Sequence, residues 1–197
     1  LIVGLILLLV MSVVGLSSIN NVAVQEKISG NIVFVLLSPL SYKEVFYAYI
    51  LASTIRGLLV GMGVYIVTLL FFDMPPMFLP IWALLFVIIG SAILGALGII
   101  AGIWAEKFDQ LAAFQNFIIL PFTFLSGVFY TIHSLPYVWQ KLSHFNPFFY
   151  MIDGFRYGFT GMADGSIQTG LIYTAALNII LFIICLRVLK SGWRLKA

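Results

Sequence analysis

The sequence predicts an all-α, polytopic membrane protein, and three observations support this class. Hydrophobic residues make up 62% of the 197 residues and charged residues only 9%, whereas a soluble domain carries about 25% charged residues. The mean hydropathy is +1.14. Several separate apolar runs are each about 20 residues long, which is the length that crosses the hydrocarbon core of a bilayer as a helix.

Polar and proline-rich stretches divide the chain into five predicted transmembrane spans within a single transmembrane domain, residues 1–197. The spans are residues 1–19, 42–72, 81–104, 111–130 and 168–189. The second span has a clear start, because Ser41-Tyr42-Lys43-Glu44 is a capping box in which Ser41 and Glu44 satisfy two backbone amides. The chain begins with Leu1 inside an apolar run and not with Met, so we expect the beginning of the protein to be missing.

A short amphipathic helix is predicted between the first two spans, over residues 25–37. Ile28, Ile32 and Val35 share one helical face, while Gln25 and Lys27 lie off it. We expect this helix to lie along the membrane surface, where an ordinary surface linker is the alternative.

The distribution of basic residues predicts that residues 131–165 leave and re-enter the same leaflet. The tail after the last span is basic and is therefore expected on the cytoplasmic side. If the fourth hydrophobic unit crosses the membrane once, seven of the ten basic residues, among them Lys27, Lys43 and Lys107, share the side of the tail. A second crossing between Phe145 and Gly161 would place the basic loops on opposite faces.

The re-entrant segment contains breaks and a possible ion pair. Asn146-Pro147 ends a first short helix, and Asp153 and Arg156 are spaced to pair on one face of a second one. We favour a structural pair over substrate ligands for these two residues. An interfacial belt is favoured over a substrate lining for most of the aromatic residues, which are Phe129, Tyr130, Trp139, Phe148, Phe149 and Tyr150.

Small residues in two spans predict close helix packing. The second span carries Gly57-x-x-x-Gly61, and the third carries small residues at spacings of three or four. The glycines of the third span are Gly95, Gly98 and Gly102. Arg56, about four turns into the second span, is either a snorkelling or paired residue or part of a pathway.

No catalytic or cofactor site is predicted. The chain has no glycine-rich loop ending in Gly-Lys-Ser/Thr, so it is not expected to bind ATP in the usual way. His133 and His144 have no nearby Cys or Glu that would favour a metal site, and a single cysteine, Cys185, excludes an intrachain disulfide. Nucleic acid is not an expected partner.

Six motifs in chain order make the sequence similar to the type-2 ABC exporter permeases. Two lie early, Gly30-Asn31 leading into Leu37-Ser38-Pro39-Leu40-Ser41, and Trp104 to Asp109. The other four lie in the broken stretch. They are Phe124-Leu125-Ser126-Gly127-Val128-Phe129-Tyr130, Leu135-Pro136, Asn146-Pro147 and Asp153-Gly154-Phe155-Arg156.

This resemblance implies a six-span half-transporter that dimerises in a bacterial cytoplasmic membrane. A separate ATPase subunit would use ATP and Mg, and residues 25–37 would be the coupling helix that contacts it, through Gln25, Lys27, Ile28, Ile32 and Val35. The re-entrant helices, with Phe129, Tyr130, Trp139, Asp153 and Arg156, would form the outer mouth. The implied substrates are lipids, glycans or drugs.

Two other classes of protein are alternatives to this hypothesis. The first is an ion-driven secondary transporter or a channel that needs no ATPase. A secondary transporter would show internal repeats and ion-coupling carboxylates in the middle of the membrane, and neither is visible in the sequence. A membrane enzyme would need clustered acidic or histidine residues within the spans, which are also lacking.

Overall fold

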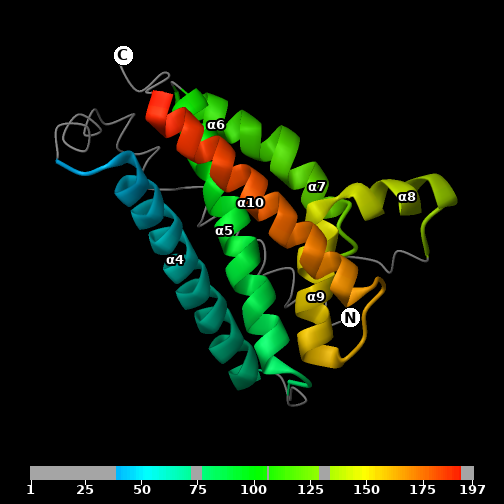
Figure 1. The fold of residues 1–197 in the computed structure, drawn as a ribbon. Coiled ribbons are helices and arrows are strands. Elements are labelled where there is room, and N and C mark those ends of the chain that lie inside the picture. The colour runs from blue at the N-terminus through cyan, green and yellow to red at the C-terminus, as the bar shows by residue number, and fades with distance from the viewer. Residues whose placement is uncertain (1–38, 72–76, 106, 129–133, 192–197) are drawn as a thin grey trace.

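The computed structural model describes residues 39–71, 77–105, 107–128 and 134–191, and these are helical with no strand among them (Figure 1). The first predicted span and the predicted coupling helix lie outside these residues. The described helices are α4 (Tyr42–Phe71), α5 (Pro80–Trp104), α6 (Phe108–Phe114), η1 (Gln115–Ile119), α7 (Leu120–Phe124), α8 (Tyr137–Phe145), α9 (Pro147–Thr160) and α10 (Ile167–Ser191).

Helix α4 begins at the predicted capping box. The backbone amide of Ser41 donates to Glu44 Oε2 at 2.7 Å, and the amide of Glu44 donates to Ser41 Oγ at 3.3 Å. Two of the amides that have no partner inside the helix are thereby satisfied. The capping prediction is confirmed, and it explains why the helix starts at Tyr42.

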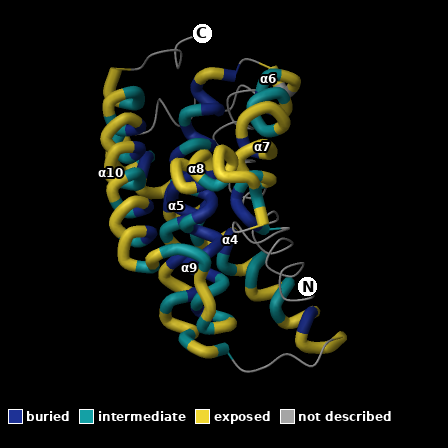
Figure 2. The backbone as a smooth tube through the Cα atoms, turned by 90° about the vertical axis from the view of Figure 1, so that its right-hand side faces the viewer, coloured by how far each residue is buried: buried dark blue, intermediate teal, exposed yellow. Residues whose placement is uncertain are grey.

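Helix α5 is the central helix, with buried positions along most of its length (Figure 2). It packs against α4, α9 and α10. Against α4, a Cβ added at Gly95 would collide with Ser53 Oγ, so the small residue allows the close approach of the two helices. Of the other predicted packing glycines, Gly57, Gly98 and Gly102 are buried and Gly61 is half-buried.

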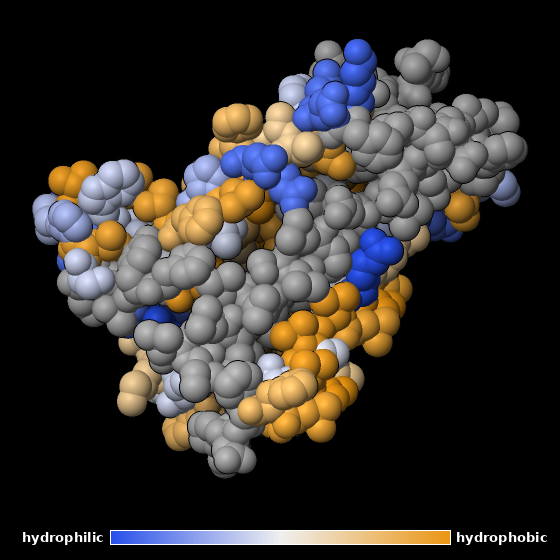
Figure 3. Space-filling model, turned by 180° about the vertical axis from the view of Figure 1, so that it is seen from behind, coloured by the Kyte–Doolittle hydropathy of each residue, from blue (hydrophilic) through white to orange (hydrophobic). Residues whose placement is uncertain are grey.

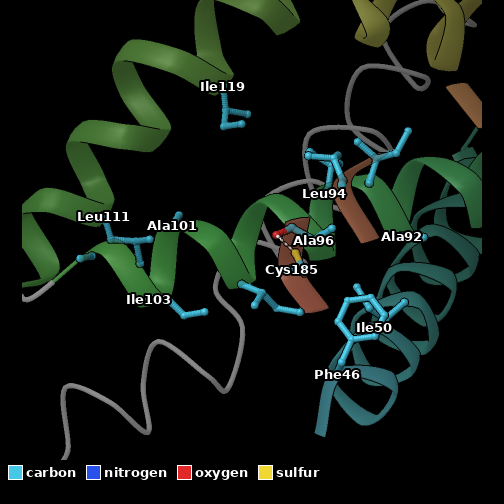
Figure 4. Close-up of a cluster of buried hydrophobic side chains, with 14 of the residues drawn as sticks. Phe46, Ile50, Ala92, Leu94, Ala96, Ala101, Ile103, Leu111, Ile119 and Cys185 are labelled. Atoms are coloured by element: carbon cyan, nitrogen blue, oxygen red, sulfur yellow. Dashed lines mark hydrogen bonds between the residues drawn. The ribbon is translucent and has the colours of Figure 1, made fainter. Parts of the chain in front are cut away.

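Helix α10 runs beside α5 in the same direction and bonds to its backbone at two levels. Asn178 Nδ2 donates to the carbonyl oxygen of Ile89, and Cys185 Sγ donates to that of Ala96, both at 3.4 Å. The two hydrogen bonds are seven residues, or two turns, apart on each helix. Figure 4 shows Cys185 and Ala96 within the main hydrophobic cluster, which also contains Phe46 and Ile50 of α4.

The fourth hydrophobic unit is helical but differs from the predicted span 111–130. It begins earlier, at Phe108, and its helix ends at Phe124, where a turn follows with Gly127 in the left-handed region at φ 76°. Its middle turn, η1, is a π-helix, and Pro121 follows in α7. A single π-helical turn has no distinct hydropathy pattern, so the sequence did not predict it.

Three of the described helices are long and apolar enough to cross a membrane: Tyr42–Phe71, Pro80–Trp104 and Ile167–Ser191. The start of α4, the end of α5, the start of α6 and the end of α10 lie toward one end of the molecule, called here the Tyr42 end, and the start of α5 lies at the other, the Pro80 end (Figure 1). Among the described residues seen from behind, hydrophobic side chains gather in a patch at the lower right of Figure 3. The count of five spans stays a prediction.

Candidate functional site

The candidate site is the broken stretch between the fourth hydrophobic unit and α10. Its two helices, α8 and α9, meet at Asn146-Pro147. Asn146 is the N-cap of α9: its Oδ1 accepts from the backbone amide of Phe148 at 3.0 Å, and Pro147 occupies the first helical position, where no amide donor is needed. The break that the sequence predicts at Asn146-Pro147 is present.

Helix α9 lies along the first half of α5 in unusually close contact. A Cβ added at Gly158 would lie 2.5 Å from the backbone nitrogen of Ala83, and one added at Gly154 would collide with the ring of Phe86. Gly154 and Gly158 are four residues apart, so both lie on the face toward α5. Sequence reasoning missed this pair, although a Gly-x-x-x-Gly spacing was its available signal.

Backbone hydrogen bonds also join α9 to the start of α5. The amide of Leu79 donates to the carbonyl of Gly158 at 2.8 Å, and that of Phe78 donates to Phe159 at 3.3 Å. Gly161 then ends α9 in the left-handed region, at φ 72°, against the ring of Phe78. The end of α9 and the start of α5 are therefore held together by backbone as well as by packing.

Asp153 organises the connection between α9 and α10. Its side chain is only 3% exposed and accepts from the backbone amides of Asp164 and Gly165, both at 2.9 Å. Arg156 donates to Asp153 and also pairs with Asp164 at 2.8 Å. The predicted pair is present, and Asp164 joins it as a second carboxylate that sequence spacing did not indicate.

Helix α8 exposes an apolar face. Val138, Leu142 and Phe145, which share one face of the helix, are all exposed, and Trp139 is exposed too. The Lys141 ammonium lies 4.8 Å from the centroid of the Tyr137 ring, within cation–π range. Such a helix suits the boundary between lipid and water, where apolar and polar groups are both satisfied.

The aromatic residues of this stretch are partly buried and partly exposed, which corrects the prediction that most of them form an interfacial belt. Trp139 is exposed. Phe148 and Phe149 are buried, Phe149 to 1% exposure, so they are packing residues and not members of an interfacial belt. Tyr150 is half-buried against Tyr173 of α10, with ring centroids 5.1 Å apart. Phe129 and Tyr130 lie outside the described residues. Helix α9 is buried by α5 and α10, a tertiary fact that composition does not reveal.

The structure describes two more of the residues singled out in the sequence, Arg56 and His144. Arg56 is exposed on α4, and the ring of His144 packs edge-on against Phe149. Among the described residues no group of three His, Cys, Asp or Glu is arranged to hold a metal ion. The predicted coupling residues lie outside the described residues. They are Gln25, Lys27, Ile28, Ile32 and Val35.

Comparison with known proteins identifies the family. The family described as "ABC-2 type transporter" matches residues 2–160. Relatives named "Inner membrane transport permease YadH", from Escherichia coli K12, Escherichia coli O157:H7 and Shigella flexneri, are each 32% identical over 173 residues, which cover 87% of this chain. The chain spans 66% of the length of these relatives. No solved structure matches. The chain belongs to the ABC-2 type transporter family.

Proposed function

We propose that this chain is the membrane-spanning permease subunit of an ATP-driven exporter in a bacterial cytoplasmic membrane. The observation behind the proposal is the family match over residues 2–160. The name of the relatives, "Inner membrane transport permease YadH", supports the location and the transport role. The substrate is a lipid, a glycan or a drug-like molecule, which two copies of the subunit move together.

The Pro80 end is the outer mouth in this proposal. Helix α9 runs along the first half of α5 and its last turn is hydrogen-bonded to Phe78 and Leu79 at that end. Helix α8, which lies beside α7 about half-way along α5 (Figure 1), carries the exposed apolar face of an amphipathic helix. The opposite end includes Lys43, Lys107 and Lys190 and leads to the basic tail, which supports a cytoplasmic location for it.

Energy comes from a separate ATPase subunit that binds ATP and Mg. We propose that residues 25–37 form the helix that contacts this ATPase, because an amphipathic helix between two spans can transmit movement to both. The first experiment is co-purification of the full-length permease with the ATPase in detergent, followed by assay of vanadate-sensitive ATP hydrolysis. A stable complex whose hydrolysis depends on the permease supports the proposal, and transport that needs no ATPase contradicts it.

The coupling face is tested by charged replacements. Ile28→Glu, Ile32→Glu and Val35→Glu are expected to abolish ATPase association, because burying an unpaired carboxylate in an apolar contact is costly. Ser29→Glu, off that face, is the matched control and is expected to leave association intact. If the three Glu variants bind the ATPase normally while remaining folded by gel filtration, the coupling assignment is wrong.

A further inference from the structure

The last turn of α7 leaves one backbone carbonyl without a helical partner. The amide of Leu125 donates to the carbonyl of Pro121 at 3.0 Å, in the normal α-helical pattern, but the next amide, that of Ser126, donates to Thr123 at 3.2 Å. The turn has tightened from four residues to three, and the carbonyl of Phe122 is passed over. An unsatisfied carbonyl within an apolar environment is costly.

Asn146 satisfies this carbonyl from 24 residues away. Its Nδ2 donates to the oxygen of Phe122 at 2.6 Å, while its Oδ1 caps α9 through Phe148. The residue is buried, and the rings of Phe122 and Phe148 stack beside it with centroids 6.2 Å apart. One amide group therefore ends one helix and begins another.

The two helices joined by Asn146 differ in how they are held. Helix α9 is bound to α5 through Gly154, Gly158 and two backbone hydrogen bonds, and α5 is in turn bonded to α10. The fourth hydrophobic unit has a π-helical turn, Gln115–Ile119, followed by Pro121. Both features interrupt the regular hydrogen bonding of a helix and are recognised sites of bending.

We infer that Asn146 is a positioning residue that fixes the α7 end of the fourth hydrophobic unit to α9. The contact between Asn146 and Phe122 is then the pivot about which the rest of that unit moves during transport. The inference rests on the proposed ATP-driven function, because that function supplies the movement. The π turn lies between the pivot and the Phe108 end, so it can bend when that end is displaced while Phe122 stays bonded to Asn146.

Two substitutions separate the pivot from the cap. Asn146→Ser keeps a good N-cap acceptor for Phe148 but has no amide donor for Phe122, whereas Asn146→Ala loses both. Ser143→Ala is the matched control, because Ser143 is fully buried one turn earlier and its Oγ has no hydrogen-bond partner. Gel filtration and thermal unfolding first establish that each variant is folded.

Double electron–electron resonance spectroscopy measures the distances between spin labels placed on either side of this contact. In a Cys185→Ala background, one pair is placed at Phe124 and Met162, across the pivot. A reference pair at Met162 and Ile184 joins the α9–α10 connection to α10 and does not cross the pivot. All three positions are substantially exposed. We expect a narrow Phe124 to Met162 distribution in the parent and in Ser143→Ala, loss of that narrow distribution in Asn146→Ser, and no change in the reference pair.

An unchanged Phe124 to Met162 distribution in Asn146→Ser overturns the inference. The second arm adds the ATPase, ATP and vanadate to the full complex, with a further label at Asp109. We expect the distance from Asp109 to Ile184 to shift while that from Phe124 to Met162 does not, and an equal shift at both overturns the pivot. Failure of the proposed function is distinguishable, because the ATPase would then bind neither the parent nor the variants, while the first arm still decides whether Asn146 holds α7.

Discussion

The buried carboxylate of Asp153 accepts from two backbone amides and from Arg156, so its charge is compensated inside a tightly packed helix. Arg156 is itself shared with Asp164, which lies in the connection to α10. The role that this geometry supports is structural, because the hydrogen-bonding capacity of the carboxylate is directed at the chain itself. Spacing predicts the first pair, since residues three apart share a helical face.

Removing Asp153 is expected to cost more than removing Arg156. Asp153→Ala leaves the amides of Asp164 and Gly165 without their acceptor, while Arg156 keeps Asp164. An unsatisfied buried donor typically costs about 1–3 kcal/mol in the free energy of unfolding. Arg156→Ala leaves Asp153 with both amide donors. Thermal unfolding in detergent measures each loss, and the double variant is expected to lose less than the sum of the single losses. Additive losses would show that the two side chains are independent.

At the scale of elements, the contact between α9 and α5 depends on the absence of side chains. Gly154 and Gly158 allow the two backbones to approach, and the amides of Phe78 and Leu79 complete the attachment. A sequence spacing of four indicates that the glycines share a face, but it does not indicate which helix they meet.

Gly158→Ala is expected to destabilise the protein and to loosen α9 from α5. The new Cβ would lie 2.5 Å from a backbone nitrogen, which cannot rotate away, and overpacking of this kind typically costs about 1–3 kcal/mol. Gly63→Ala in α4 is the matched control, because nothing lies within 4 Å of its added Cβ. There Ala is expected to be neutral or to stabilise the helix by about 0.5–1 kcal/mol. Thermal unfolding of the two variants decides the point, and equal effects would contradict it.

For the whole molecule, the arrangement of helix ends leads to a topology that can be tested. The start of α4, which carries Lys43, and the end of α10, which carries Lys190, lie toward the same end of the described helices (Figure 1). Met162 follows the end of α9, whose last turn is hydrogen-bonded to Phe78 and Leu79 just before α5. Basic residues next to spans favour the cytoplasmic side.

Single cysteines at Met162, Lys43 and Lys190 are expected to differ in their reaction with a reagent that does not cross the membrane. In a Cys185→Ala background, a membrane-impermeant maleimide added to spheroplasts should label Met162→Cys but not Lys43→Cys or Lys190→Cys. Permeabilised cells provide the control, since both lysine positions should then react. Labelling of Lys190→Cys in intact spheroplasts would reverse the proposed orientation of the chain.

The sequence by itself determined the features that depend on local chemistry. Composition set the all-helical membrane class, Ser41 and Glu44 set the start of α4, and Asn146-Pro147 set the break before α9. The spacing of Asp153 and Arg156 predicted their ion pair. Each of these follows from residues within a turn or two of one another, where caps, prolines and helical spacing act.

Only the tertiary structure decided which surfaces meet. It buried Phe148 and Phe149, brought Gly158 against Ala83, and bonded Asn146 to a carbonyl 24 residues away. The physical reason is that lipid-facing and protein-facing positions of a membrane helix are both apolar, so hydropathy does not distinguish the packed face from the exposed one. The contacts between distant segments are therefore known only from the packed helices.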